Sequence, residues 1–482
     1  MQIGSACNFI DAVWQPSSAG LTMPVTDPST GSPWETIADS TLEDVDAAVR
    51  AARRAFDQGP WGRTTALDRG RMLTRLRDLI GRHAEELAAL EARDTGKPRS
   101  AAVADITALA RYFEFYGGAA DKLHGEVVPY VDGTLVTVLR EPYGVTGHIL
   151  PWNYPAQMFG RTLAPALAAG NAVVLKPAED ACATPLRLAQ LATEAGFPAG
   201  AINVVTGRGA VSGAALAAHR GIDFVSFTGS PAVGQIVQKL AADHFVACTL
   251  ELGGKSPQIV FADADLDLAV PIIRKAILQN AGQTCSAGSR VLVQRSILPE
   301  LTTRLQAAFN AARAGAPEMD LDCGPIINAK QQQRVKGIIR RALESGVPVL
   351  AEGAIATGVN PGGYFVAPLF FGVPERTSEL ACEEVFGPVL TILPFDDEAD
   401  AIALANATDY GLVAAVWTRD GGRQMRMAKR IRTGQVFVNC YGAGAGIELP
   451  FGGRGKSGHG REKGFAAMHE FTTTKTVIFS HG

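Results

Sequence analysis

Cys285 lies in surroundings that suit a nucleophilic thiol. It belongs to the segment GQTCSAGSR, residues 282–290, where its neighbours are small or polar. A structural cysteine usually has large apolar neighbours, whereas a reactive thiol needs a polar setting and room for a substrate. The segment therefore favours a nucleophile, although a single cysteine of this kind also fits a protein in which it has no catalytic role.

Two other segments could support such a nucleophile. Glu251 opens ELGGKSP, residues 251–257, and a partly desolvated carboxylate before a turn can act as a general base. Asn153 lies in LPWNYP, residues 150–155, between prolines that restrict the backbone. A rigidly held amide is a good donor to a developing oxyanion. Each residue also fits a non-catalytic interpretation: Glu251 as a surface glutamate before a turn, and Asn153 as an asparagine in a turn.

A phosphate-binding turn is indicated at FTGSPAVG, residues 227–234, where Gly229 and Ser230 end a strand and a helix should follow. The N-terminus of a helix after a glycine turn suits a pyrophosphate, but the spacing is not that of the dinucleotide-binding fingerprint. Two lysine-containing turns, GGKS at 253–256 and GKS at 455–457, lack the preceding glycine of a nucleoside-triphosphate loop. A nucleoside triphosphatase is therefore disfavoured.

The composition sets the broad class of protein. The chain has 482 residues, of which 47% are hydrophobic and 19% charged, so two or three globular domains are expected. A net charge of −3 argues against nucleic-acid binding. The seven cysteines form no CxxC pair, which argues against a zinc site and a disulfide scaffold and favours a reducing, cytoplasmic location. We find neither a secretory signal nor a run of about 20 apolar residues, so no membrane span is expected.

The segments that position these residues alternate between strand and helix patterns. Helices are expected at 44–56, along a run at 67–93, and at 184–195 and 209–218. The strand candidates are AVVLK, INVVT, FVSFT and PQIVF in one region, VLVQ, LTILPF, AAVWT and VFVN in a second, and FTTTKTVIF in the tail. This alternation predicts βαβ units, parallel sheets and an α/β fold.

Taken in this order, the segments resemble the aldehyde dehydrogenase superfamily. LKPAED at 175–180, EEVFGPV at 383–389 and PFGGRGKSGHGRE at 450–462 strengthen the resemblance, which extends from about residue 20 to the C-terminus. It implies an NAD-dependent, non-acylating enzyme that oxidises an aldehyde to a carboxylic acid. Cys285 would attack the aldehyde, Asn153 and the backbone N–H of Cys285 would hold the oxyanion, and Glu251 would activate water to hydrolyse the thioester.

The resemblance also implies which residues contact the cofactor. The matching positions are Trp152, Lys176, Glu179, Gly229, Ser230, Glu384 and Phe386. Glu179 stands where NAD-preferring relatives bind the adenosine 2′-hydroxyl, and its charge would repel a 2′-phosphate. We therefore expect NAD rather than NADP, and no metal.

The substrate is less well specified. Arg161 stands where succinic-semialdehyde dehydrogenases grip a substrate carboxylate, which predicts an aldehyde with an acidic end; the alternative is a structural ion pair. The second arginine of those enzymes is replaced by Gln279. Tyr154, Met158 and Phe451 are expected to line the tunnel. The glycines of GAGAGIE, residues 442–448, would leave room for a bulky or aromatic aldehyde.

Three other functions compete with this interpretation. A coenzyme-A-acylating dehydrogenase would usually lack Glu251, and a non-catalytic binding protein on this fold would be expected to lose Cys285, Asn153 or Glu251. A cofactor-free thiol hydrolase would need a histidine beside the cysteine. The eight histidines include none in the core motifs: His148 is near PWN and His459 lies in the tail loop.

The family resemblance finally implies a domain plan. A Rossmann-like NAD-binding domain is expected at 1–120 and 141–250, and an α/β catalytic domain at 251–450. A small β oligomerisation element with the tail is expected at 121–140 and 451–482. A homodimer or homotetramer would be usual, with a small-molecule aldehyde as the only other partner.

Overall fold

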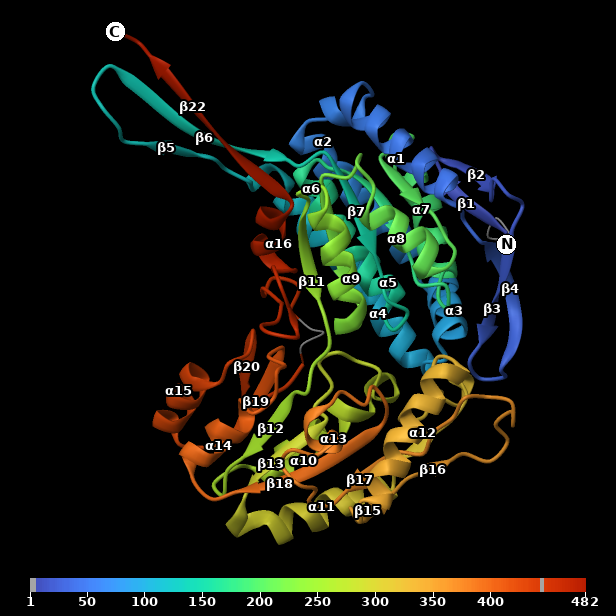
Figure 1. Ribbon diagram of the computed structural model, residues 1–482, viewed down its shortest axis with the longest axis vertical. Helices are drawn as coiled ribbons and strands as arrows, with labels where there is room; N and C mark the ends of the chain where they lie inside the picture. The colour runs from blue at the N-terminus through green and yellow to red at the C-terminus, as the bar shows by residue number, and fades with distance from the viewer. Residues whose placement is uncertain (1–5, 443–445) are drawn as a thin grey trace.

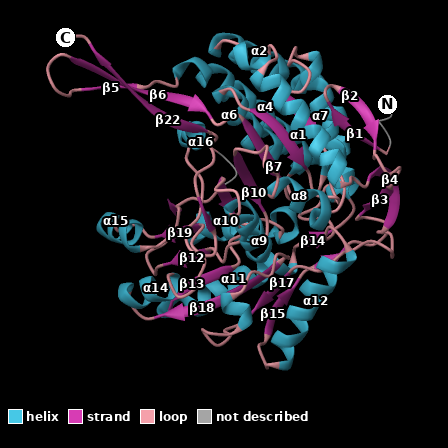
Figure 2. Ribbon diagram, turned by 45° about the horizontal axis from the view of Figure 1, so that its top comes forward, coloured by secondary structure: helices cyan, strands magenta, loops and turns pink. Residues whose placement is uncertain are grey.

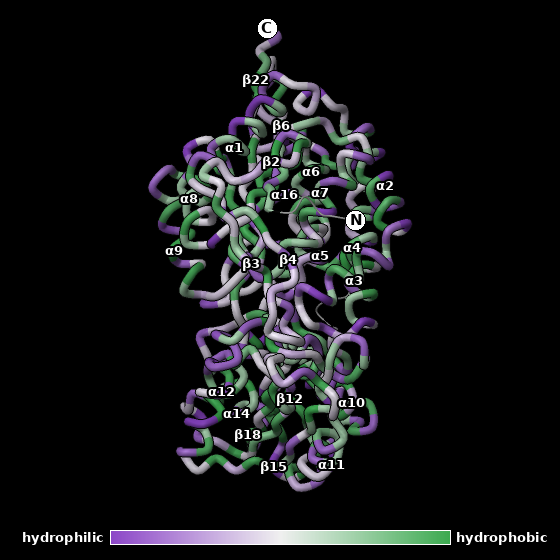
Figure 3. Tube along the Cα trace, turned by 90° about the vertical axis from the view of Figure 1, so that its right-hand side faces the viewer, coloured by the Kyte–Doolittle hydropathy of each residue, from purple (hydrophilic) through white to green (hydrophobic). Residues whose placement is uncertain are grey.

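The computed structural model describes residues 6–442 and 446–482 and has two α/β lobes, from one of which a narrow β-sheet projects. Figure 1 shows the N-terminal half in the upper lobe and most of the C-terminal half in the lower lobe. Figure 3 shows the two lobes stacked along the long axis, with the C-terminal strand extending beyond them. The α/β fold predicted from the alternating segments is confirmed.

The upper lobe contains an eight-stranded sheet in the order β2-β1-β9-β8-β7-β10-β11-β21. Its strands are β1 (Cys7–Ile10), β2 (Val13–Pro16), β7 (Val145–Ile149), β8 (Ala172–Lys176), β9 (Ile202–Val204), β10 (Phe224–Thr228), β11 (Ala247–Glu251) and β21 (Gly458–His459). A separate hairpin joins β3 (Thr22–Asp27) to β4 (Ser32–Ala38). The five central strands are parallel. Four of them, β7, β8, β9 and β10, are buried along their whole length, which is typical of strands in a parallel sheet covered on both faces.

The strand order of this sheet reverses next to β7. The chain runs from β7 through β8 to β9 on one side, and β10 then returns to pair with the other side of β7. In open α/β sheets, ligands bind outside the carboxyl ends of the strands at such a reversal. The fold therefore directs attention to the loops that follow β7, β8, β10 and β11.

Helices surround the sheet of the upper lobe (Figure 2). They are α1 (Leu42–Asp57), α2 (Ala66–Arg82), α3 (Ala84–Thr95), α4 (Arg99–Ala119), α5 (Pro155–Met158), α6 (Ala164–Ala169), α7 (Ala183–Glu194), α8 (Ala214–Ala217) and α9 (Pro231–Ala242). A capping box between Thr41 and Asp44 starts α1. The predicted run 67–93 is divided at His83 into α2 and α3, because the backbone of His83 leaves the helical conformation.

The lower lobe contains a seven-stranded sheet in the order β15-β17-β18-β13-β12-β19-β20. Its strands are β12 (Pro257–Val260), β13 (Arg290–Gln294), β15 (Val349–Glu352), β17 (Leu369–Phe371), β18 (Val389–Phe395), β19 (Val413–Trp417) and β20 (Gln435–Val438). Its helices are α10 (Leu266–Leu278), α11 (Leu298–Asn310), α12 (Ala329–Glu344), α13 (Glu379–Cys382), α14 (Glu398–Ala405) and α15 (Gly421–Arg430). The short strands β14 (Arg313–Ala314) and β16 (Ala354–Ile355) pair beside this sheet. All the predicted strands are confirmed, but PQIVF, which we grouped with the first region, forms β12 in the centre of the second sheet.

The projecting sheet joins β5 (Glu126–Val128), β6 (Thr134–Pro142) and β22 (Thr472–Ser480). β22 follows α16 (Gly464–Glu470) and pairs with the whole length of β6, so the β-rich tail predicted from the sequence finds its partner within the subunit. The domain limits stay a prediction. We note that β21, which falls in the predicted tail range, adds to the edge of the first sheet.

Among residues 6–442 and 446–482, every helix is too short or too polar to cross a bilayer. Within the same ranges, His, Cys, Asp and Glu side chains nowhere gather in a group of three that could bind a metal ion.

Candidate active site

The residues predicted from the motifs meet where the two sheets face each other. Trp152 and Asn153 follow β7, Lys176 ends β8, Ser230 follows β10 and Glu251 ends β11, all at the carboxyl edge of the first sheet. From the second sheet, Cys285 lies in the loop before β13, and Glu384 and Phe386 precede β18. Hydrogen bonds connect the two edges: the N–H of Gly254 donates to Oε1 of Glu384 at 2.8 Å.

The backbone before Cys285 is held in an unusual conformation. Asn280, Ala281 and Gly282 have φ angles of 50°, 54° and 73°, which are left-handed values that cost free energy for the two residues with a side chain. A Cβ atom on Gly282 would lie 2.0 Å from the carbonyl oxygen of Gly387, so only glycine fits there. The side chain of Gln283 fixes the loop, since it accepts from the N–H of Ile327 at 2.9 Å and donates to the carbonyl of Pro325 at 3.2 Å.

Cys285 is half-buried, and all seven cysteines are free. Its side chain packs against an apolar group formed by Leu412, Val413, Phe437, Tyr441 and Phe451. Burial raises the pKa of the thiol to about 12, and the opposing influence is the positive charge of Arg161. The nucleophile therefore lies beside a cation in a largely apolar site.

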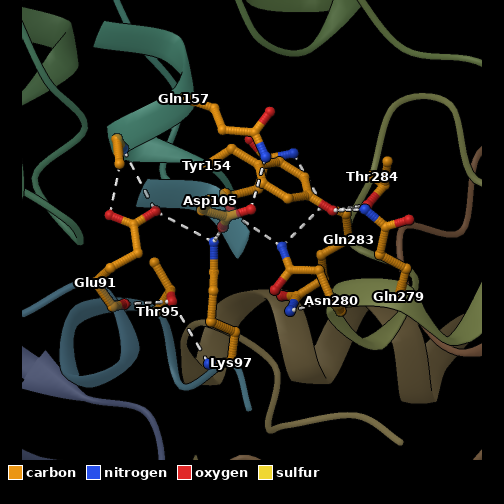
Figure 4. Close-up of polar contacts among 12 residues, drawn as sticks. Glu91, Thr95, Lys97, Asp105, Tyr154, Gln157, Gln279, Asn280, Gln283 and Thr284 are labelled. Carbon is orange, nitrogen blue, oxygen red and sulfur yellow. Dashed lines mark hydrogen bonds and ion pairs between the residues drawn. The ribbon is translucent and has the colours of Figure 1, made fainter. Parts of the chain in front are cut away.

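Asn153 is held from several sides by buried polar residues, and Figure 4 shows Lys97, Asn280 and Gln283 among them. Its side-chain amide donates to the carbonyl of Gln283 at 2.9 Å, which directs it at the loop that carries Cys285. Its own carbonyl accepts from Nζ of Lys97 at 3.1 Å and from Nδ2 of Asn280 at 3.0 Å. An amide fixed in this way has one N–H left to donate, as an oxyanion requires.

Lys97 is the centre of this network and was missed by our sequence analysis. It is buried at the α3–α4 connection, pairs with the carboxylates of Glu91 and Asp105, and lies over the ring of Tyr154 at 4.5 Å. Glu91 also accepts from the N–H of Ala156 at 3.2 Å. The segment after β7 is thus attached to α3 and to the α3–α4 connection through Asn153, Tyr154 and Ala156. The feature that distinguishes Lys97 is its burial, which is unusual for a lysine and cannot be read from a sequence.

Glu251 is a buried carboxylate with few partners. Its side chain is 1% exposed, and neither carboxylate oxygen has a hydrogen bond to another described residue. Burial raises the pKa of Glu251 well above its usual value, the neighbouring charge of Glu462 raises it further, and Arg161 lowers it. A carboxylate with a raised pKa and free oxygens can accept a proton from water.

Arg161 lies on a π-helical turn, Phe159–Leu163, between α5 and α6. Its Nη2 is 3.5 Å from a carboxylate oxygen of Glu251, its Nε pairs with Glu462, and its guanidinium lies 4.2 Å from the ring centre of Phe451. The sequence predicted either a substrate carboxylate or an ion pair for this arginine. The observed partners are the carboxylates of Glu251 and Glu462, which lie outside the helical segment of Arg161.

The other predicted tunnel residues are buried around the same place. The hydroxyl of Tyr154 bonds to Oγ1 of Thr284 at 2.7 Å and accepts from Nε2 of Gln279 at 2.9 Å. The side-chain amide of Gln279 is therefore already hydrogen-bonded within the protein. Met158 and Phe451 are buried in apolar clusters. Of the segment 442–448, which we expected to shape the tunnel wall, residues 443–445 lie outside the described residues.

Most of the predicted cofactor residues form a row along the carboxyl edge of the first sheet, and Phe386, which precedes β18 of the second sheet, meets this row at Trp152. Lys176 pairs with Glu179 at 2.8 Å, and Glu179 also accepts from the N–H of Gly209 at 3.3 Å. Burial acts to raise the pKa of Glu179, but Lys176 outweighs it and the pKa lies below its usual value. Ser230 caps the first turn of α9. A carboxylate, an ammonium group and a helix N-terminus are the groups that ribose hydroxyls and a pyrophosphate need.

The end of this row at Phe386 and Glu384 is aromatic and acidic. Phe386 has a φ angle of 56°, and its ring meets the edge of Trp152 with 5.4 Å between the ring centres. Burial raises the pKa of Glu384 to about 7, opposed by the hydrogen bond from Gly254. A Cβ on Gly253 would lie 2.5 Å from Glu384, so the glycine lets the two loops approach closely.

Comparison with known proteins agrees with this geometry. The model of the aldehyde dehydrogenase family matches residues 14–477. The chain belongs to the aldehyde dehydrogenase family. A mitochondrial family 2 member B4 aldehyde dehydrogenase of Arabidopsis thaliana is 41% identical over 474 residues, which are 98% of this chain and 86% of the relative.

Solved structures of aldehyde dehydrogenases superpose closely. A crystal structure from Burkholderia cenocepacia that is assigned to this group is 59% identical, with a TM-score of 0.98, and the match covers 99% of this chain and 100% of the other. Betaine aldehyde dehydrogenase of Staphylococcus aureus, solved with NAD+, is 35% identical with a TM-score of 0.96 over 99% of this chain and 95% of the other. The chain is therefore an NAD-dependent aldehyde dehydrogenase, and the predicted family, enzyme class and cofactor are confirmed.

Proposed function

We propose that this enzyme oxidises an uncharged aldehyde to a carboxylic acid through a thioester on Cys285. The position of Arg161 carries the proposal on the substrate: the cation beside the thiol is already matched by Glu251 and Glu462. A third carboxylate, brought by a substrate, would meet two like charges at short range. The aromatic and aliphatic neighbours of Cys285 support an apolar aldehyde instead.

The protein groups have distinct tasks in the proposed reaction. The thiolate of Cys285 attacks the carbonyl carbon, and the amide of Asn153 and the N–H of Cys285 donate to the oxyanion. A lost oxyanion donor typically costs roughly 2.7–4 kcal/mol. The bound cofactor supplies the acceptor for the hydride that leaves this carbon. Glu251 then takes a proton from the water that attacks the thioester, so that the acid and the free thiol are released.

We assign the cofactor contacts along the same row. Lys176 and Glu179 would bind the adenosine ribose, Gly229 and Ser230 the pyrophosphate, and Glu384, Phe386 and Trp152 the nicotinamide riboside. The support is the order of these groups along the strand ends. Each group also has the hydrogen-bonding character that its part of the cofactor requires.

Substrate preference tests the proposal directly. NADH absorbance is followed with purified enzyme that is offered succinic semialdehyde or an uncharged aldehyde of the same chain length. We expect the higher kcat/KM for the uncharged aldehyde, by about tenfold or more, since like charges at short range cost several kcal/mol. A strong preference for succinic semialdehyde would instead support Arg161 as the anchor of a substrate carboxylate.

Cofactor choice depends on Glu179 in this proposal. Because Lys176 keeps its pKa low, Glu179 is ionised at neutral pH and repels a 2′-phosphate. Glu179→Ser should raise kcat/KM for NADP by about tenfold or more, since like-charge contacts cost several kcal/mol. Initial rates with each cofactor measure the change, and Glu344→Ser at an exposed site serves as the control. An unaltered ratio of NAD to NADP use would remove Glu179 from the ribose site.

We also propose that the projecting sheet holds subunits together. Its exposed apolar residues include Val127, Tyr130 and Ile478, at 71%, 70% and 60% exposure, and such patches usually mark interfaces. Light scattering should give at least twice the subunit mass of 50.7 kDa, and Ile478→Lys should lower it. Met425→Lys, at an exposed apolar site on α15, is the matched control. A monomeric wild-type enzyme would refute the assignment.

We place the enzyme in the cytoplasm, on the strength of seven free cysteines, which persist in a reducing compartment. The Arabidopsis relative is described as mitochondrial. Cell fractionation with an antibody distinguishes the two locations.

A further inference from the structure

Arg161 is a buried cation in contact with two buried carboxylates. Its side chain is 5% exposed, and its carboxylate partners, Glu251 and Glu462, are each 1% exposed. Neither carboxylate has a hydrogen bond from another described residue. Burying a charge without hydrogen bonds is costly unless an opposite charge compensates it. The guanidinium of Arg161 is placed to do this for both groups.

Local structure fixes the guanidinium from several sides. The π-helical turn lies close to α4: a Cβ on Gly160 would lie 3.0 Å from atoms of Leu109 and Tyr112. π-Helical turns are frequent at functional sites because they displace one side chain from the helical register. Glu462 holds Nε, and the ring of Phe451 lies below the guanidinium at 4.2 Å. The Nη2 that faces Glu251 is therefore fixed in position.

We propose that Arg161 is a positioning residue for the general base: it compensates the charge of Glu251 and orients its carboxylate, while Glu462 anchors the arginine. The inference rests on the proposed function, in which Glu251 activates water for thioester hydrolysis. Glu251 lies at the end of β11, Glu462 follows β21, and Arg161 belongs to the helical segment that follows β7. In the sheet, β7 and β11 lie on either side of β10, and β21 pairs with β11. Arg161, Glu251 and Glu462, the triad, therefore follow strands that are close neighbours in one sheet.

The charges around the triad set the direction of the pH effect. Burial and Glu462 raise the pKa of Glu251, whereas Arg161 lowers it. The other titratable groups that act on the triad are Tyr112 and Tyr116 of α4, Cys285, and Arg461 and Lys463 before α16. Without the arginine, Glu251 would stay protonated to a higher pH. Without the charge of Glu462, it would ionise at a lower pH.

Two substitutions therefore shift the pH profile in opposite directions. For an uncharged aldehyde, Arg161→Met should move the acid midpoint of kcat upward by roughly 1–3 units, the usual effect of an opposite charge at this range. Glu462→Gln should move the midpoint downward. Arg161→Lys should return it toward the wild-type value. Arg304→Met, which removes an exposed arginine on α11, is the control and should leave it unchanged.

The NADH burst separates this inference from the proposed function. The burst reports the steps up to the thioester, so its amplitude at alkaline pH should stay near one NADH per subunit in both variants. An unshifted midpoint with an intact burst would overturn the role of Arg161 while leaving the reaction in place. A higher KM for succinic semialdehyde alone would make Arg161 a substrate anchor. If Arg161→Met does not fold, Glu462→Gln still tests the proposal. A downward shift of its acid midpoint supports the triad, and an unchanged midpoint refutes it.

Discussion

Cys285→Ala should reduce NADH formation from any aldehyde by about 10⁴-fold or more, because loss of a covalent nucleophile removes the route through the thioester. The change deletes one sulfur atom in a half-buried site, so the fold should be retained. Initial rates at saturating NAD measure the effect. Circular dichroism and the melting temperature of the variant should match the wild type.

A second cysteine provides the control for this experiment. Cys7→Ala removes a half-buried thiol of β1, at the far edge of the first sheet, and should keep wild-type turnover. Alkylation with iodoacetamide adds a further measurement, since loss of activity should follow modification of Cys285 as mapped by peptide mass. Substantial turnover in Cys285→Ala would show that the thioester route is not the one used.

The catalytic residues could be predicted because each lies in a short segment with its own local signal. Cys285 has small neighbours, Asn153 is flanked by prolines, and Glu251 precedes a glycine turn. The strands that carry these segments were also predictable, because continuous apolar runs between helical segments are typical of a parallel sheet. At these residues, the signal in the local sequence and the position in the folded structure indicate the same site.

The partners of these residues could not be predicted in the same way. The pairing of Arg161 with Glu462 joins segments far apart in the sequence, and β21 reaches the first sheet only after the chain has completed the second. Lys97 looks like an ordinary surface lysine in sequence, yet it is 1% exposed and supports Asn153. Such contacts join segments that only the tertiary fold brings together, and no local periodicity in the sequence indicates them.

Glu251→Gln should separate the two halves of the reaction. Hydride transfer does not require the base that activates water, so one NADH per subunit should form rapidly in a stopped-flow experiment. Steady-state turnover should then fall by roughly 10²–10⁴-fold, the usual contribution of a general base. Intact-protein mass spectrometry after the burst should detect the acyl group on Cys285.

The remaining outcomes of Glu251→Gln distinguish the competing reactions. Turnover that coenzyme A restores fully would identify an acylating dehydrogenase, in which Glu251 is dispensable. Loss of the burst as well would indicate that Glu251 is needed before hydride transfer, for example to take the proton of Cys285, whose pKa is raised by burial. Glu352→Gln, at an exposed carboxylate of β15, is the matched control and should leave both phases unchanged. A burst that survives while the steady-state rate falls would place Glu251 in hydrolysis alone, and loss of both would place it in both steps.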